Sequence, residues 1–333
     1  MSTETNHKRN LIIIVILFVN VLLAVWFSSK NPHEMLLPIF LKSNSTSTST
    51  LTSTFKTVSK WKNNRLVVIP AIWKEINWAN HSSWPPWLRD GLDLFNKNTS
   101  RAYDTHLYQR IDPNSTAPYN WPYCRNVHEE AGVYLKFIYD YYYDLPDRML
   151  FIHGNPHTHY PYPIEAGLCV RDDVHYANIN SFWIDNRRWT AWNRDRIDDI
   201  SLTYTCAARL LTLLGFNAEA QLNPNSLKPK DQGLISTLCC AQFYVRKERI
   251  HHYTYGQWAA LYNVSLQPHC VTTDPTHEIL RRPDRKWFSQ SFEHLWHVIL
   301  GLDATNMPPL KRKTNTDPCH LFRSSCKGSP CSK

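Results

Sequence analysis

An apolar segment over residues 11–27 sets the strongest constraint on how this chain can fold. The segment LIIIVILFVNVLLAVWF has one polar interruption, Asn20, and reaches the roughly 17 residues that a membrane-spanning helix needs. Lys8 and Arg9 precede it, and basic residues beside a span favour the cytoplasmic side. A cleaved signal peptide would have similar flanks, but its apolar run is usually shorter, and no A-x-A site follows here. We predict a single-pass type II membrane protein of the Golgi or another secretory-pathway membrane.

The segment after the anchor, residues 28–60, predicts a Ser/Thr-rich stem. Its tract SNSTSTSTLTST at residues 43–54 has almost no apolar surface to bury, so burial cannot offset the entropy cost of ordering it. Hydroxyl-rich tracts of this kind are typical of O-glycosylated stalks. Sequons for N-glycosylation fit the same topology and occur at Asn44, Asn80, Asn98, Asn114 and Asn263.

The formal net charge of +9 lies mainly at the two ends of the chain. Bases outnumber acids before residue 60 and after residue 310, notably in KRK at 311–313, whereas the two nearly balance in between. A basic excess confined to the tails is typical of a solvated or membrane-proximal surface. We therefore expect no nucleic-acid partner. The predicted parts are a cytoplasmic tail (1–10), the anchor (11–27), the stem (28–60), a luminal α/β catalytic-like domain (61–310) and a basic Cys-containing tail (311–333).

All 9 cysteines follow the anchor, where an oxidising lumen would allow them to pair. The odd number leaves at least one of them unpaired. A zinc cluster of Cys319, His320, Cys326 and Cys331 is the alternative for the C-terminal group, but the spacing fits no finger or ribbon. Disulfides are therefore the expected state.

Strand and helix patterns alternate along residues 60–310. The apolar runs at 65–70 and 149–152 are typical of buried strands. Apolar residues recur at helical spacing over 127–143, 195–214, 247–262 and 288–300. This order predicts an α/β fold, an open mixed sheet with helices on both faces.

Two loops follow the predicted strands, and open α/β sheets bind ligands at the carboxyl ends of their strands. The first loop contains Glu75 and Trp78, which could hold a sugar ring and its hydroxyls, although a buried Trp at a helix start is equally consistent. The second carries His153, His157 and His159, a spacing that could bind a divalent metal in a luminal metallohydrolase. Hydrogen-bonding histidines in a polar loop remain the other interpretation.

The last predicted helix places Glu293 one turn before His297, beside an apolar face that contains Trp296. A carboxylate at the rim of an aromatic wall can have a raised pKa, as a general base requires. A surface pair is equally consistent with the spacing. The chain contains no G-x-S-x-G, H-E-x-x-H, P-loop or G-x-G-x-x-G motif.

The segment NVHEEAGVYLKFIYDYYYDLPDRMLFIHGNPHTH at residues 126–159 resembles the central motif of the domain-of-unknown-function family numbered 3431, whose members resemble glycosyltransferases. Matching positions lie elsewhere too, in VVI at 67–69 with the following Glu and Trp, in AQFYV at 241–245 and in EHLWH at 293–297, so the resemblance spans about residues 65–300. Within the central motif, the residues that match the family are Asn126, Val127, Glu130, Ala131, Tyr134, Leu135, Ile138, Tyr142 or Tyr143, Leu145, Pro146 and Asp147. The chain differs at His128 and Glu129, where the family tends to have Gly-Arg, and it has no Asp-x-Asp after the strand at 149–152.

The resemblance implies a Golgi-type glycosyltransferase with a nucleotide-diphospho-sugar transferase-like (GT-A-like) domain, which moves a sugar from a nucleotide-sugar donor to a glycan or glycoprotein acceptor. A divalent cation such as manganese is a possible cofactor. Glu293 would deprotonate or orient the acceptor hydroxyl, and His153 is the second catalytic candidate. The residues predicted to contact substrate are Glu75, Trp78, Glu130, Gly154, Asn155, Trp296 and His297, and those predicted to bind metal are His157 and His159. A non-catalytic glycan-binding membrane protein is a further alternative.

Overall fold

The computed structural model describes residues 59–62, 64–92, 101–114, 121–180, 183–188, 199–217, 234–238, 241–267, 270, 287–301 and 318–331. The predicted cytoplasmic tail, the anchor and nearly all of the stem lie outside these residues, as do the sequons at Asn44 and Asn98. Among the residues that are described, no helix combines the length and the hydropathy needed to cross a membrane.

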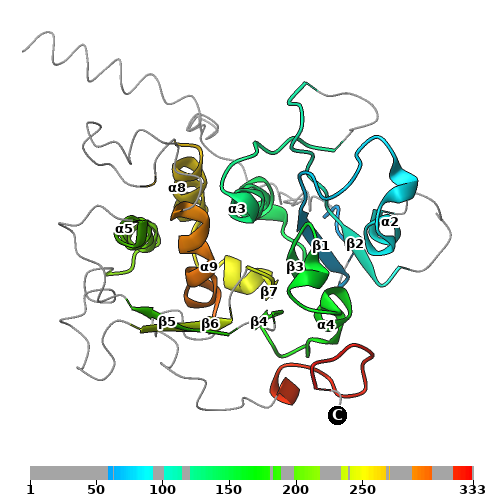
Figure 1. Cartoon of the computed structure of the whole chain (residues 1–333). Helices are drawn as coiled ribbons and strands as arrows, with labels where there is room; N and C mark the ends of the chain where they lie inside the picture. Colours follow the sequence, from blue (N-terminus) through cyan, green and yellow to red (C-terminus); the bar gives the residue numbers. More distant parts are fainter. Residues whose placement is uncertain are drawn as a thin grey trace, which may run out of the picture. The chain divides into compact units, whose positions relative to one another are not determined.

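A mixed sheet forms the centre of the fold (Figure 1). Strand β1 (Leu66–Ala71) lies between β2 (Tyr103–Thr105) and β3 (Arg148–His153), parallel to both. Strand β7 (Phe243–Arg246) is antiparallel to β3, and β4 (Tyr176–Asn178) is antiparallel to β7. The order β2-β1-β3-β7-β4 confirms the predicted open mixed sheet, and β1 and β3 confirm the two predicted strands.

Helices cover both faces of this sheet, as predicted. The evidence is that alternate residues of β1 belong to two separate apolar clusters, one on each face. Val67 and Ile69 join the cluster that contains buried residues of α3 (Glu129–Tyr141), α5 (Asp199–Leu213), α8 (Tyr255–Ser265) and α9 (Trp287–Leu300). Leu66 and Val68 join the cluster under α2 (Pro86–Leu92) and α4 (Pro163–Cys169). A strand buried on both faces is apolar throughout, which explains the continuous run in the sequence.

The remaining elements are short. Strands β5 (Trp183–Arg188) and β6 (Leu234–Leu238) form a separate antiparallel pair. The prediction of one helix over 247–262 is wrong. The segment forms two helices, α7 (Lys247–Ile250) and α8, because Thr254 and Gln257 form a capping box that starts α8. Single 3-10 turns are η1 (His81–Ser83), η2 (Tyr142–Asp144), η3 (Pro156–Thr158) and η7 (Pro318–His320).

Among the described residues, the disulfides Cys169–Cys326 and Cys206–Cys270 join distant parts of the chain, and Cys319–Cys331 closes a short loop. The C-terminal cysteines are therefore paired rather than arranged as zinc ligands. Residues 318–331 belong to the folded body, since Phe322 is buried and forms an antiparallel bridge with Val170 at the end of α4. Cys124 is buried and is the free cysteine among the described residues.

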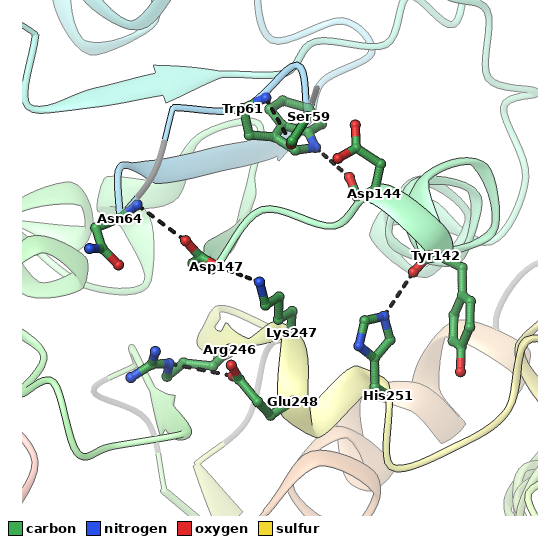
Figure 2. A network of polar contacts seen from close by, with 10 residues as sticks. All are labelled: Ser59, Trp61, Asn64, Tyr142, Asp144, Asp147, Arg246, Lys247, Glu248 and His251. Atoms are coloured by element: carbon green, nitrogen blue, oxygen red, sulfur yellow. Dashed lines mark hydrogen bonds and ion pairs between the residues drawn. The ribbon is translucent and has the colours of Figure 1, made fainter. Parts of the chain in front are cut away.

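The amino-terminal ends of β1 and β3 are held by the polar network of Figure 2. Asp147 accepts from the backbone N–H of Asn64 at 3.2 Å and forms an ion pair with Lys247, which follows β7. The indole of Trp61 donates to the carbonyl of Asp144. Trp61 and Asn64 are thereby attached at this edge of the sheet.

Candidate functional site

Loops from four strands meet at the opposite edge of the sheet. Parallel strands β1 and β3 end side by side, with Ala71 opposite His153, while antiparallel β7 begins there. Gln242, just before β7, is fully buried and connects the loops: its Oε1 accepts from the His153 N–H, and its Nε2 donates to the carbonyls of Pro156 and Ile179. Gln242 was not among the predicted site residues, although it lies in the AQFYV stretch at 241–245 that carries part of the family resemblance.

The two loops named from the sequence are in contact. Gly154, after β3, lies against Glu75, after β1, so closely that a Cβ added to the glycine would be 2.7 Å from the carboxyl carbon of Glu75. The carboxylate of Glu75 is fixed from its own loop, because its Oε2 accepts from the Trp73 N–H at 2.6 Å. A larger residue at this position would displace the Glu75 carboxylate, so Gly154 and Glu75 form one structural unit.

Three glutamates come together beside these loops. Glu129 and Glu130 lie in the first turn of α3 and Glu293 lies in α9, and one carboxylate oxygen from each falls within 4.8 Å of the other two. We call these three residues the acid cluster. Sequence reasoning named Glu130 and Glu293 separately, and the fold places them in the same site.

The two helices are held side by side by aromatic contacts. The rings of His128 and Phe288 are 4.2 Å apart at their centroids, and those of Tyr134 and Trp296 are 6.0 Å apart. Because positions increase together along both helices, α3 and α9 run in the same direction. Their amino-terminal halves therefore face the same edge of the sheet, and the acid cluster lies there.

Arg110 connects the acid cluster to the first loop. Its side chain is buried, and one guanidinium nitrogen donates to the carbonyl of Val127 at 3.2 Å. Burial lowers the pKa of Arg110, and the fields of Glu130, Glu75 and Glu129 oppose that change. Glu75, Glu129 and Glu130 thus act on one guanidinium. Nothing in the sequence distinguished Arg110 from the other arginines, so this residue was missed.

Glu130 is the buried member of the acid cluster. Its residue exposure is 5%, and burial, reinforced by the charge of Glu129, raises its pKa to about 7. Its own backbone N–H and Arg110 act in the opposite direction. Within the described part of the chain, its Oε1 has no hydrogen-bond partner, and neither has the buried hydroxyl of Tyr134, one helical turn away.

The turn that leads into α3 has an unusual backbone. His128 and Glu129 have φ values of 51° and 52°, in the left-handed region that favours glycine. Gly132 allows this turn to pack against the helix, because a Cβ there would be 2.3 Å from the carbonyl oxygen of Val127. Two successive strained residues are maintained where they direct Glu129 and Glu130 into the site.

The aromatic candidates are placed differently from one another. Trp78 is 5% exposed, donates its indole N–H to the Trp73 carbonyl and packs on Trp84, so its ring faces the core. Trp296 is also buried, beneath the acid cluster, against Phe243. The exposed ring of the first loop is Trp73, at 40%. A stacking surface for a ligand is therefore offered by Trp73 rather than by Trp78.

The histidines of the second loop do not gather around one point. The rings of His153 and His159 stack with centroids 4.3 Å apart, and burial together with His153 lowers the pKa of His159 to about 4. The exposed His157 instead lies 2.8 Å from the carbonyl oxygen of Pro161 through its Nδ1. Among the described residues, the set of three side chains close enough to share an ion is the acid cluster, not these histidines. A role for His157 and His159 as a pair of ligands stays a prediction.

The other predicted positions lie as follows. Asn155 is exposed at the start of η3, and His297 lies one turn after Glu293, where burial lowers its pKa to about 3. The asparagines of the described sequons, Asn80, Asn114 and Asn263, are all exposed, as glycosylation would require.

The fold and the site define a class of protein: an open mixed α/β sheet with a carboxylate-rich site where parallel strands end. Residues 80–165 match the model of a family described as "Protein of unknown function (DUF3431)", which confirms the resemblance found in the sequence. The matched segment includes the acid-cluster residues of α3 and the loop after β3. No curated protein and no solved structure matches the chain.

Proposed function

We propose that this protein is a glycosyltransferase of the secretory pathway, with a GT-A-like domain held to the membrane by residues 11–27 and extended by the stem. One observation carries the proposal: the loop after β1, the loop after β3 and the acid cluster meet at the carboxyl edge of the sheet, with Arg110 between them. Nucleotide ligands bind at this edge in open α/β sheets.

The site has the parts that glycosyl transfer requires. The exposed face of Trp73 suits stacking with a base or a sugar ring, and Glu75 and Asn155 supply hydrogen-bonding groups beside it. Arg110 supplies positive charge near the position of the donor diphosphate. In the reaction, the bond between the anomeric carbon and the diphosphate breaks, a bond to the acceptor oxygen forms, and the nucleoside diphosphate leaves.

Glu293 is the carboxylate best placed to receive the proton of the acceptor hydroxyl. It is partly exposed, whereas its neighbour Glu130 is buried. Positioning of a proton acceptor at the attacking hydroxyl typically contributes about 10²–10⁴-fold to the rate. His153, the second candidate from the sequence, is partly buried at the end of β3, in the loop proposed to hold the donor.

The test is a screen of nucleotide sugars against the whole chain, purified from secretory expression so that its disulfides form. We expect saturable binding of one nucleotide class by calorimetry and slow hydrolysis of the corresponding donor. Glu293→Gln should retain donor binding and lose hydrolysis by about 10²-fold or more. The matched control is Glu248→Gln, an exposed glutamate at the far edge of the sheet. The proposal fails if no nucleotide sugar is bound or hydrolysed, with or without Mn²⁺.

Membrane topology has its own test. Protein expressed in a secretory host should stay in the membrane fraction after extraction with alkaline carbonate. Its electrophoretic mobility should increase after removal of N-glycans. Substitution of Asn80, Asn114 and Asn263 by Gln should remove a corresponding part of that shift. A protein that carries no glycan and is extracted by carbonate would contradict the proposed orientation.

A further inference from the structure

We propose that the acid cluster, Glu129, Glu130 and Glu293, binds one hard divalent cation, with Mn²⁺ as the probe. This site differs from the metal site predicted at His157 and His159. The proposal stands on the arrangement of the three carboxylates and does not depend on sugar transfer.

The spacing of the carboxylates suits a shared ion. One oxygen from each residue lies within 4.8 Å of the other two. Two oxygens bound to one Mn²⁺, Mg²⁺ or Ca²⁺ at about 2.0–2.6 Å can be at most about 4–5 Å apart. The donor set consists of carboxylates alone, which favours these oxygen-seeking cations over zinc or copper.

Polar atoms buried beside the cluster provide a second, independent observation. In the described chain, Oε1 of Glu130 and the hydroxyl of Tyr134 have no hydrogen-bond partner, and both residues are more than nine-tenths buried. Tyr134 lies one helical turn after Glu130 on α3, so both side chains are on the same side of that helix. Buried polar atoms without partners are costly, and a buried charge is usually paired or bound to a metal. An ion and its waters would supply the missing partners.

The packing of the two helices favours a shared ion as well. The two helices that carry the glutamates are fixed by ring packing, so the ligands are already assembled.

The site is open on one side. Glu129 is exposed and Glu293 is partly exposed, while Glu130 forms the buried floor. An ion there would retain coordination positions for water or for oxygens of a bound anion. Glu293 contributes one carboxylate oxygen to the ion, and Mn²⁺ binding measured without a sugar donor tests this role separately from its proposed role as proton acceptor.

The experiment is a titration of the purified whole chain with Mn²⁺, followed by electron paramagnetic resonance of the free ion at neutral pH. We expect one Mn²⁺ bound per chain. Glu130→Gln and Glu293→Gln should each weaken binding by at least about tenfold, because each removes one of three charged ligands. Glu248→Gln and the pair His157→Ala with His159→Ala should leave the affinity unchanged.

Several results would overturn the proposal. One is wild-type protein that binds no Mn²⁺; the close carboxylates then share a proton instead. Another is binding that disappears in the histidine pair and persists in both glutamate variants, which would move the site to the second loop. Unfolding of a variant is excluded by circular dichroism, and Glu293→Asp provides a further check, since it retains the charge and should bind Mn²⁺ more tightly than Glu293→Gln.

Discussion

Glu130 is expected to destabilise the metal-free protein at neutral and alkaline pH, and Glu130→Gln should relieve this cost. The folded-state pKa of about 7 lies above the ordinary value of 4.5. The folded protein therefore binds more protons than the unfolded chain between these two values, and its stability falls as pH rises through that window. The difference corresponds to about 3 kcal/mol, fully present above pH 7 and absent below about pH 4.

The assay is urea unfolding in EDTA, monitored by tryptophan fluorescence at pH 4.5 and pH 8. Gln resembles the protonated carboxyl group, so Glu130→Gln should have nearly wild-type stability at pH 4.5. At pH 8 it should exceed the wild type by a few kcal/mol. Glu248→Gln, an exposed control, should follow the wild type at both pH values. Excess Mn²⁺ should then stabilise the wild type more than Glu130→Gln, because the ion binds the folded state and binds the variant more weakly.

A stability difference between Glu130→Gln and the wild type that is the same at both pH values would refute this reasoning. So would a variant less stable than the wild type at pH 8, because Glu130 would then stabilise the fold as an ordinary buried partner. In the expected result, the charge of Glu130 weakens the fold and is required to bind the ion. Such a conflict between stability and binding is typical of a functional site.

Further predictions concern other parts of the fold. Replacing the Cys169–Cys326 pair by alanines should lower the free energy of unfolding by about 2–5 kcal/mol in urea titrations, because the bond closes a loop of 157 residues; an unchanged midpoint would contradict this. Trp73→Ala should weaken nucleotide-sugar binding by about 1–2 kcal/mol in calorimetry with little loss of stability, whereas Trp78→Ala should unfold the protein several kcal/mol more easily. Burial lowers the pKa of His106 to about 3, so the unfolded chain binds a proton at this residue before the folded protein does. The free energy of unfolding should therefore fall by on the order of 1–3 kcal/mol as pH falls below about 6.5. His106→Phe should reduce this loss of stability in acid.

The sequence predicted the fold wherever burial leaves a regular pattern. Strand β1 is apolar throughout because both of its faces are covered, and α3 repeats its apolar positions every three to four residues. The break between α7 and α8 was missed, because the capping box of Thr254 and Gln257 is a hydrogen-bond pattern within an otherwise helical composition. The antiparallel direction of β7 was likewise invisible, since a single strand carries no mark of its partner.

The site was predictable in its parts and not in its assembly. The resemblance identified Glu130 and Glu293, but their meeting depends on the parallel packing of α3 and α9, which are far apart in the sequence. Trp78 was chosen over Trp73 because spacing cannot tell which ring of a loop faces the core. Arg110 follows a three-residue strand and has no motif around it, so only its burial beside carboxylates reveals its role.

The attachment of residues 59–62 and 64 determines from which side the protein can be held. Trp61 and Asn64 are bonded where β3 begins, and a six-residue strand places that end about 20 Å from the opposite edge of the sheet. A support coupled ahead of Ser59 would therefore leave the edge that carries Glu75 open to large ligands. Immobilised protein should consequently bind ligands of any size as well as protein in solution does.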